Sequence, residues 1–242
     1  RVLFRSVIEA NLRKKLRWDT QPDELWKFYY DLLYLAREHG LMAAGLDIPA
    51  TLKKRITGKG IEGLTPIEKE LIFSTGLADE AYKDYMFSIF RDVHCGMAHK
   101  PMQVKLYNTW IARNDRMAQS ITKLKQYYKN PLVVIIGGGH TSYALGVINR
   151  VSAINPELSQ VNLSLSEISL KPASLSAYLV PLYLKGYEKN PPADFIYFSQ
   201  RSSYEDPCIS FKKQLAEMRK KALSNACSDQ LSGVRCQLLI LF

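Results

Sequence analysis

The stretch that most constrains the fold runs from residue 131 to residue 150 and reads PLVVIIGGGHTSYALGVINR. Residues 132–136 are wholly apolar and mostly β-branched, which is typical of a strand buried on both faces of a parallel sheet. The glycines at 137–139 let the backbone turn tightly, and residues 142–151 have a helical pattern. Because ligands of open α/β sheets bind at the carboxyl edge of the strands, the turn residue His140 is the leading candidate for a chemical site.

Two interpretations of His140 fit this local pattern equally. The residue belongs to a ligand site, or it caps a helix or bonds a carbonyl group in an ordinary strand-to-helix turn. The motif is not a dinucleotide fingerprint, because Thr141 and Ser142 stand where the third glycine would be and no acidic residue follows a strand at the required distance. A phosphate loop is also excluded, since the sequence contains no Gly-Lys-Ser/Thr.

Length, charge and cysteine content narrow the class of protein. The 242 residues suffice for one sizeable α/β domain, and the formal net charge of +10 is spread over short basic runs on separate expected helices. Scattered runs are typical of solvated faces, and aromatic residues do not interleave with them, so we expect no nucleic-acid partner. The four cysteines lack CxxC spacing and predict neither a disulfide scaffold nor a zinc site. No apolar run reaches the roughly 18 residues of a membrane span.

Both ends of the chain look unusual. Residues 1–6, RVLFRS, resemble a translated adapter remnant and are excluded from the fold argument. We therefore expect the true amino end, with any targeting signal, to be missing. Residues 225–242 form a polar stretch followed by QLLILF and are expected to be an irregular tail.

The remaining pattern predicts alternating helices and strands. Apolar residues recur at helical spacing in several segments. Helices are expected at residues 7–18, 22–39, 51–56, from 65 onward with Thr65 as N-cap and Glu68 closing a capping box, 79–94, 102–128 and 209–222. Strands are expected at residues 41–48, 132–136, 161–165 and 193–199. This order favours one α/β layer domain, over residues 7–224.

The long helix expected at residues 102–128 carries polar residues where aliphatic ones would be expected. Asn114 falls inside its apolar stripe, Arg113 on the flank of the stripe, and Asp115 on a neighbouring face. Polar groups in a core-facing stripe must be paired or must line a cavity. They form either a buried structural network or a pocket wall that faces the His140 turn, and we favour the wall because this helix leads directly into the strand before that turn. Asp47 follows another expected strand in the same way.

Five segments together carry a resemblance to a known family. They are AREHG at 36–40 leading to GLDIP at 45–49, ARNDRMA at 112–118, IIGGGH at 135–140 with GV at 146–147, DFIYF at 194–198, and EDPC at 205–208. In order and spacing they resemble the ChaN-like haem-binding uptake proteins of the Tiki superfamily, over residues 15–222. The resemblance implies an α/β fold whose parallel-rich central sheet is flanked by helices, with a ligand cleft at its carboxyl edge.

The resemblance also implies haem or iron handling and, in related members, metal-assisted hydrolysis built from two GxxH-type elements and acidic residues. His140 matches the histidine of the second element, and Asp115 and Met117 match the acidic and apolar positions of the helix signature. Asp47 stands where the family usually has asparagine. The first element, Gly-Glu-x-His, is not found, so we expect the domain to lack its first strand or strands.

The leading hypothesis is therefore a haem-iron binding protein. Its candidate cofactor-binding residues are His140, Tyr143, Arg113, Asn114, Met117 and Asp47. Tyrosinate suits ferric iron, and the positive charge suits haem propionates, another small anionic ligand, or an anionic membrane surface met peripherally. The alternative is a hydrolase that uses a divalent metal, with His140 as metal ligand and His140 and Asp115 as catalytic residues. A homodimer is left open, and the resemblance favours the cell envelope or periplasm.

Overall fold

The computed structural model describes residues 9–16, 18–19, 22–77, 80–169, 171, 173–213 and 215–217. The chain forms two compact units, Arg1–Leu46 and Asp47–Phe242. The expected adapter remnant at residues 1–6 and the expected tail at 225–242 lie outside the described residues.

The first unit contains two helices, α1 (Glu9–Lys15) and α2 (Asp23–Glu38). Both fall within the segments whose spacing predicts amphipathic helices. Trp26 is buried on α2, and the Trp18 ring packs edge-on against Tyr29 with 4.7 Å between ring centroids. Aromatic contacts of this kind let so short a unit bury apolar surface.

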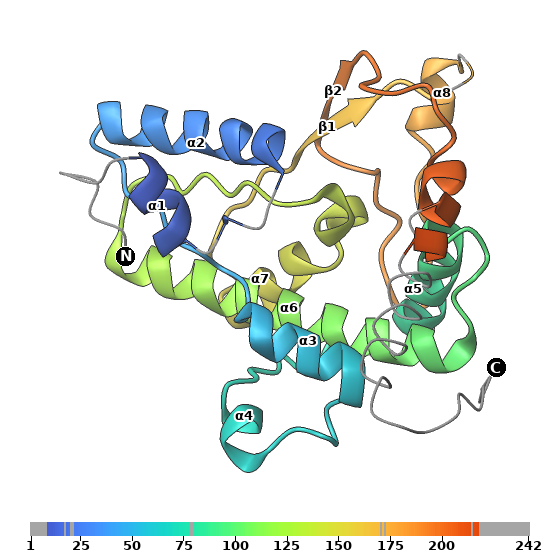
Figure 1. Cartoon of the computed structure of the whole chain (residues 1–242), viewed down its shortest axis with the longest axis horizontal. Helices are drawn as coiled ribbons and strands as arrows, with labels where there is room; N and C mark the ends of the chain where they lie inside the picture. Colours follow the sequence, from blue (N-terminus) through green and yellow to red (C-terminus); the bar gives the residue numbers. More distant parts are fainter. Residues whose placement is uncertain are drawn as a thin grey trace, which may run out of the picture. The chain divides into compact units, whose positions relative to one another are not determined.

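The second unit is built around one long helix, α6 (Lys100–Tyr127), which packs against α3, α5 and α7 (Figure 1). Its other elements are α3 (Ala50–Lys59), α4 (Pro66–Glu70), α5 (Glu80–Val93), η1 (Gly138–His140), η2 (Ser142–Ala144), α7 (Val147–Ile154), β1 (Leu163–Glu167), α8 (Leu175–Tyr178) and β2 (Phe195–Ser199). Residues 207–213 are also helical, which agrees with part of the helix expected at 209–222; residues 214 and 218–222 lie outside the described residues.

Two apolar clusters on either side of α6 form the core of this unit. One joins α3 to α6 and contains Ile48, Leu52, Ile56, Leu64 and Ala112. The other joins α5 to α6 and contains Tyr82, Met86, Phe90, Tyr107 and Leu145. Because α6 contributes to both clusters, its orientation determines where the polar side chains between them lie.

Side chains cap the start of two helices, of which only the one at Thr65 was predicted. The side chain of Thr65 accepts a hydrogen bond from the Glu68 backbone N–H, and a carboxylate oxygen of Glu68 accepts the Thr65 backbone N–H at 2.9 Å, which completes the predicted capping box of α4. The side chain of His99 accepts a hydrogen bond from the Met102 backbone at the start of α6. Side chains of this type satisfy backbone N–H groups that the first turn leaves unpaired.

The strands are fewer than the sequence predicts. β1 and β2 pair in parallel with Leu163 opposite Phe195, close to two of the expected strands. Neither of the segments expected to be strands at residues 41–48 and 132–136 is a strand. The parallel pairing agrees with an α/β class, whereas a central sheet flanked by helices is not confirmed, because the described residues form only this two-stranded sheet.

The segment at residues 132–136 also differs from the prediction in its burial. Val133 is 84% exposed and Ile135 is 58% exposed, although both were expected to be buried on the two faces of a sheet. An apolar run predicts burial only where neighbouring strands supply ladder partners. In the described part of the chain this segment has none, so its alternate apolar side chains face solvent.

A disulfide that the cysteine spacing did not predict joins Cys95, after α5, to Cys208, after β2. Beside it, the ring of His94 packs edge-on against Phe211. The sequence separation hides this pair, because the two cysteines are 113 positions apart. Cys227 and Cys236 lie outside the described residues.

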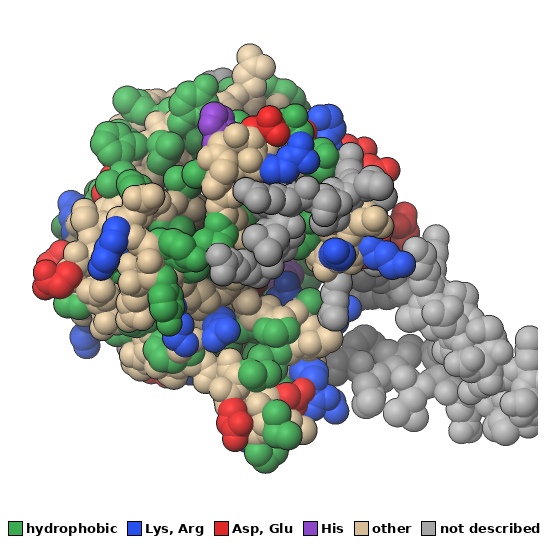
Figure 2. Space-filling model, turned by 90° about the vertical axis from the view of Figure 1, so that its left-hand side faces the viewer, with side chains coloured by type: hydrophobic (Ala, Val, Ile, Leu, Met, Phe, Trp, Pro, Cys, Tyr) green, Lys and Arg blue, Asp and Glu red, His purple; other side chains and the backbone are tan. Residues whose placement is uncertain are grey.

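The surface carries many apolar side chains and scattered cations. On the face shown in Figure 2, Lys and Arg side chains are separated by hydrophobic ones, as the scattered basic runs predict. Within the described ranges, no helix has the length and apolar content needed to cross a bilayer.

Candidate functional site

The glycine run that follows residue 136 forms a tight turn instead of the start of one continuous helix. His140 donates its backbone N–H to Gly137 at 2.9 Å, and two short 3-10 turns precede α7. A helix was expected from residue 142, but Tyr143, Ala144 and Gly146 have positive φ angles of 60°, 57° and 67°. Left-handed residues cannot continue a right-handed helix, so α7 begins only at Val147.

The His140 side chain is held between two residues of α6. Its Nδ1 lies 2.5 Å from Oδ1 of Asn114, and its ring stacks on Trp110 with 3.9 Å between centroids and 10° between planes. A Cβ at Gly139 would lie 3.3 Å from the Trp110 ring, so a glycine there allows this close approach. The expected meeting of the His140 turn with the polar face of the long helix therefore occurs at Asn114.

The imidazole of His140 is neutral at ordinary pH. Burial lowers the pKa of His140 from 6.5 to about 4, and the nearby Arg113 cation acts in the same direction while Asp47 opposes it. Because the oxygen of the Asn114 amide can only accept, Nδ1 carries the proton in this bond. Nε2 of His140 therefore keeps its lone pair, which is the form in which imidazole ligates metals.

One donor beside this ring has no partner. Asn114 is fully buried, and its Nδ2 makes no hydrogen bond within the described part of the chain. A Cβ at Gly146 would lie 3.4 Å from that nitrogen and would collide with the carbonyl group of His140. The turn is thus closed so tightly over Asn114 that only glycine fits at position 146.

Arg113 and Asp47 form a half-buried ion pair next to the site. Arg113 Nε donates to Asp47 Oδ2 at 2.8 Å, and Asp47 Oδ1 accepts the backbone N–H of Ile48 at 2.8 Å. The pair joins α6 to the start of α3 and supplies the two charges that act on His140. Arg113 of α6 thus positions the carboxylate of Asp47.

Asp115 belongs to a separate buried network. Its Oδ1 accepts hydrogen bonds from Arg150 Nε at 2.7 Å and from Thr75 Oγ1 at 2.6 Å. Arg150 is fully buried, also donates to Gly146 O at 2.8 Å, and lies over the Tyr82 ring at 5.6 Å. Asp115 therefore pairs with the Arg150 cation and not with His140. This pairing agrees with a buried structural network and does not support Asp115 as a proton acceptor beside His140.

Of two other predicted site residues, one is buried and one is partly buried. Met117 is 4% exposed on α6. Tyr143 packs edge-on against Tyr85 of α5, with 6.5 Å between ring centroids. Burial raises the pKa of Tyr85 to about 12, and the phenol of Tyr143 adds to this increase.

Sequence reasoning missed Trp110 and Arg150. Trp110 was assigned to the apolar stripe of the long helix, and its indole also donates to the hydroxyl oxygen of Tyr82 at 3.0 Å. Arg150 could have been recognised from the sequence in one way, because it is the single charged residue in the helix VINRVSAI. A lone charge on a buried helix requires a partner of opposite charge, and Asp115 is that partner.

Comparison with known families now identifies the chain. The family model described as "Haem-binding uptake, Tiki superfamily, ChaN" matches residues 1–151. The chain belongs to this ChaN family. No curated protein and no solved structure matches the chain. The matched part includes α1 to α6, the glycine turn and Arg150, whereas β1 and β2 lie beyond it.

The description of the ChaN family names haem. The free ring nitrogen of His140 suits haem iron, but His140 does not line an enclosed pocket in the described part of the chain. A neutral imidazole with a free Nε2 is a suitable ligand for haem iron. In the described part of the chain, one cavity of about 250 Å³ lies beside α7, and another of about 430 Å³ is lined by Arg13, Asp23, Glu24, Trp26 and Lys27. His140 lines neither of them. A haem at His140 would therefore lie on an open surface.

The divalent-metal alternative gains no support. Among the described residues, no group of three or more His, Cys, Asp or Glu side chains could hold a metal ion. A hydrolytic metal site normally uses three protein ligands.

Proposed function

We propose that this ChaN-family chain binds haem iron through Nε2 of His140, with the porphyrin lying against the exposed segment before the glycine turn. The observation that carries the proposal is the neutral imidazole whose Nδ1–H is bonded to Asn114, 2.5 Å away. A hydrogen bond on one ring nitrogen fixes the tautomer and orients the other nitrogen toward a metal. When bound, haem would supply the iron centre, and His140 would hold it through Nε2.

The surface leading to His140 supports a flat apolar ligand. Val133, Ile135 and Gly137 are exposed, whereas the residues between them are half-buried, so the exposed three share one face of the segment. The three glycines are exposed, and a Cβ at Gly137 would lie 3.9 Å from Cδ2 of His140, next to Nε2. His140 itself is 6% exposed, and the absence of side chains at these glycines is what would let a planar ligand reach this edge of the ring.

Asn114 supports the same assignment. Its unpaired Nδ2 is a buried donor beside His140, and buried polar groups are rarely left without a partner. A polar atom of a ligand or a water that follows the ligand into the site would satisfy it. The excess of 10 positive charges over the whole chain favours an anionic ligand such as haem at long range.

Hemin titration of the whole chain tests the proposal. We expect a Soret band that is lost in His140→Ala and retained in His39→Ala, which removes an exposed histidine. Val133→Asp should weaken hemin binding at least tenfold, because it places a charge on the apolar face while altering a residue that is already 84% exposed. Iron-free protoporphyrin should bind the wild type and His140→Ala alike, since it has no iron to ligate.

Two results would overturn the assignment. A Soret band unchanged in His140→Ala would exclude the imidazole as ligand. Loss of the band in Tyr143→Phe, with full retention in His140→Ala, would assign the iron to the tyrosine instead.

The expected cell-envelope location gains support from the Cys95–Cys208 disulfide. Disulfides persist in oxidising compartments and are rare where glutathione keeps thiols reduced. Fractionation of cells that express the complete gene would test this location, and recovery of the chain in the reducing cytosol with both thiols free would contradict it.

A further inference from the structure

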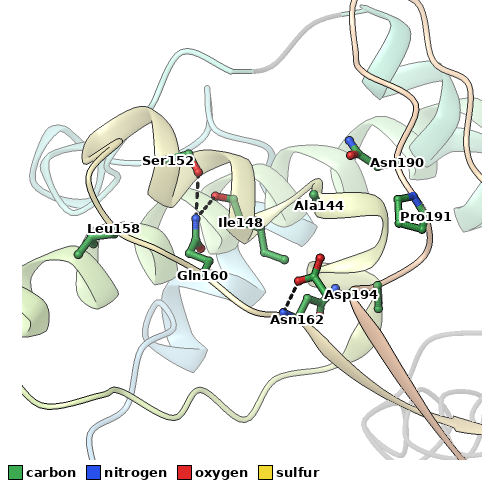
Figure 3. Close-up of a pocket in the computed structure, with 10 residues that line it drawn as sticks. Ala144, Ile148, Ser152, Leu158, Gln160, Asn162, Asn190, Pro191 and Asp194 are labelled. Carbon is green, nitrogen blue, oxygen red and sulfur yellow. Dashed lines mark hydrogen bonds between the residues drawn. The ribbon is translucent and has the colours of Figure 1, made fainter.

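A cavity lies apart from His140, between α7 and the segments that lead into β1 and β2 (Figure 3). It measures about 250 Å³. Its lining residues are Ala144, Ile148, Ser152, Leu158, Gln160, Asn162, Asn190, Pro191, Ala193 and Asp194. Since Asn162 and Asp194 directly precede the two parallel strands, the cavity lies at their amino ends.

The charge of this cavity is opposite to that of the chain. Of the described lining residues, Asp194 alone is charged, whereas the whole chain has a net charge of +10. One carboxylate oxygen of Asp194 accepts the backbone N–H of Asn162 at 2.7 Å. The other oxygen points into the cavity (Figure 3) and has no hydrogen-bond partner among the residues described.

The amide side chains of the lining present oxygens to a ligand. Gln160 Nε2 donates to the Ile148 carbonyl at 3.1 Å and to Ser152 Oγ at 2.9 Å. Nδ2 of Asn162 and Nδ2 of Asn190 donate to backbone carbonyls at 3.1 and 3.3 Å. The carbonyl oxygens of these three amides accept no hydrogen bond from the described residues, so they are free acceptors beside the free Asp194 oxygen. Each asparagine amide also keeps one free N–H, so the Asp194 carboxylate is the group that favours a cationic ligand.

The cavity wall is set by a strained turn. Tyr143 and Ala144 both have left-handed backbone angles, and Tyr143 donates its N–H to Pro192 O at 3.0 Å across the cavity rim. Non-glycine residues in this conformation cost free energy and cluster at functional sites. The same turn that carries His140 therefore also fixes the position of the Ala144 wall.

We propose that this cavity binds a small ligand with a primary ammonium group and an apolar body. An ammonium group has three donors and no acceptor, which complements the Asp194 carboxylate and the free amide oxygens. Ile148, Leu158 and Ala193 supply apolar wall for the body of the ligand. At about 30 Å³ per water-sized group, the cavity holds about eight non-hydrogen atoms.

Three isosteric probes separate charge from shape. Hexylammonium, hexanol and hexanoate are titrated against the whole chain, and binding is followed by calorimetry and by NMR shifts of residues 144–162. We expect hexylammonium to bind at least tenfold more tightly than hexanol, and hexanoate not to bind. Asp194→Asn should reduce hexylammonium affinity at least tenfold, because it removes the charge while its amide oxygen still accepts the Asn162 N–H.

Two further variants make the test specific. Glu157→Gln removes an exposed carboxylate that does not line the cavity and should leave the affinity unchanged, whereas Ser152→Leu fills the cavity and should abolish binding. Equal binding of the three probes, no binding of hexylammonium, or insensitivity to Asp194→Asn would overturn the proposal. Because His140 does not line this cavity, His140→Ala should retain amine binding, which separates this test from that of haem binding.

Discussion

Lowering the pH should destabilise the chain through His140, and the size of the effect follows from its burial. The pKa of His140 is about 4 in the folded chain, against 6.5 without the protein environment, mainly because burial disfavours the charged ring. Between these two values the unfolded chain binds a proton that the folded chain does not. The contribution of His140 to the free energy of unfolding is therefore fully present above pH 6.5 and is lost progressively as the pH falls to about 4.

The magnitude is about 3 kcal/mol, at about 1.4 kcal/mol per pKa unit. The free energy of unfolding of a typical domain is roughly 5–15 kcal/mol, so this loss is a large fraction of the total. Urea unfolding followed by circular dichroism at pH 7, 6, 5 and 4.5 measures it. His140→Gln is the matched reference, because its amide keeps a donor for Asn114 but does not titrate.

The difference between wild type and His140→Gln isolates the imidazole from all other titrating groups. We expect this difference to shrink by about 2 kcal/mol between pH 7 and pH 4.5, since the full loss is reached only below pH 4. A direct NMR titration of the His140 ring should give a pKa well below 6.5. Parallel stability curves for the two proteins, or a ring that protonates at or above pH 6.5, would refute the assignment of a buried neutral imidazole.

Three further predictions concern the residues that hold the site. Arg150→Met should lower the free energy of unfolding in urea by about 3–5 kcal/mol, because it leaves Asp115 as an unpaired buried charge. Adding Asp115→Leu should recover much of that loss, and simple additivity of the two changes would contradict the pairing. Gly146→Ala should lower the free energy of unfolding by at least about 1–3 kcal/mol and shift the NMR resonances of the His140 ring, because the new Cβ would stand at a left-handed position against the His140 carbonyl. Unchanged NMR spectra would contradict this turn geometry. Reduction should lower stability by about 2–5 kcal/mol in the wild type but not in a Cys95→Ala/Cys208→Ala variant, and equal responses of the two proteins would contradict the disulfide.

The helices could be predicted from the sequence because their signals are local. Apolar spacing placed α2, α5 and α6 to within about two residues, and the Thr65 capping box placed the start of α4. Strands were harder to predict, since a strand exists only where another segment pairs with it. Residues 132–136 have the composition of a buried strand, yet Val133 and Ile135 are exposed because no described segment pairs with them.

The candidate site was predictable only in part. The glycine run singled out His140, and the polar positions in the long helix singled out Asn114, which is its hydrogen-bond partner. The same reasoning assigned Asp115 to a site with His140, although its carboxylate bonds to Arg150. Adjacent residues on a helix point about 100° apart, so Asn114 and Asp115 face different neighbours, and periodicity alone does not tell which neighbours those are.

By itself, the sequence determined where helices start and stop, where the chain turns without side chains, and which polar residues interrupt an apolar face. Only the tertiary structure decided the partners of those residues. The pairs His140–Asn114, Arg150–Asp115 and Cys95–Cys208 join positions 26, 35 and 113 residues apart. Contacts over such separations form only when the packing of several elements outweighs the entropy of closing the loop between them, and no local pattern encodes that balance.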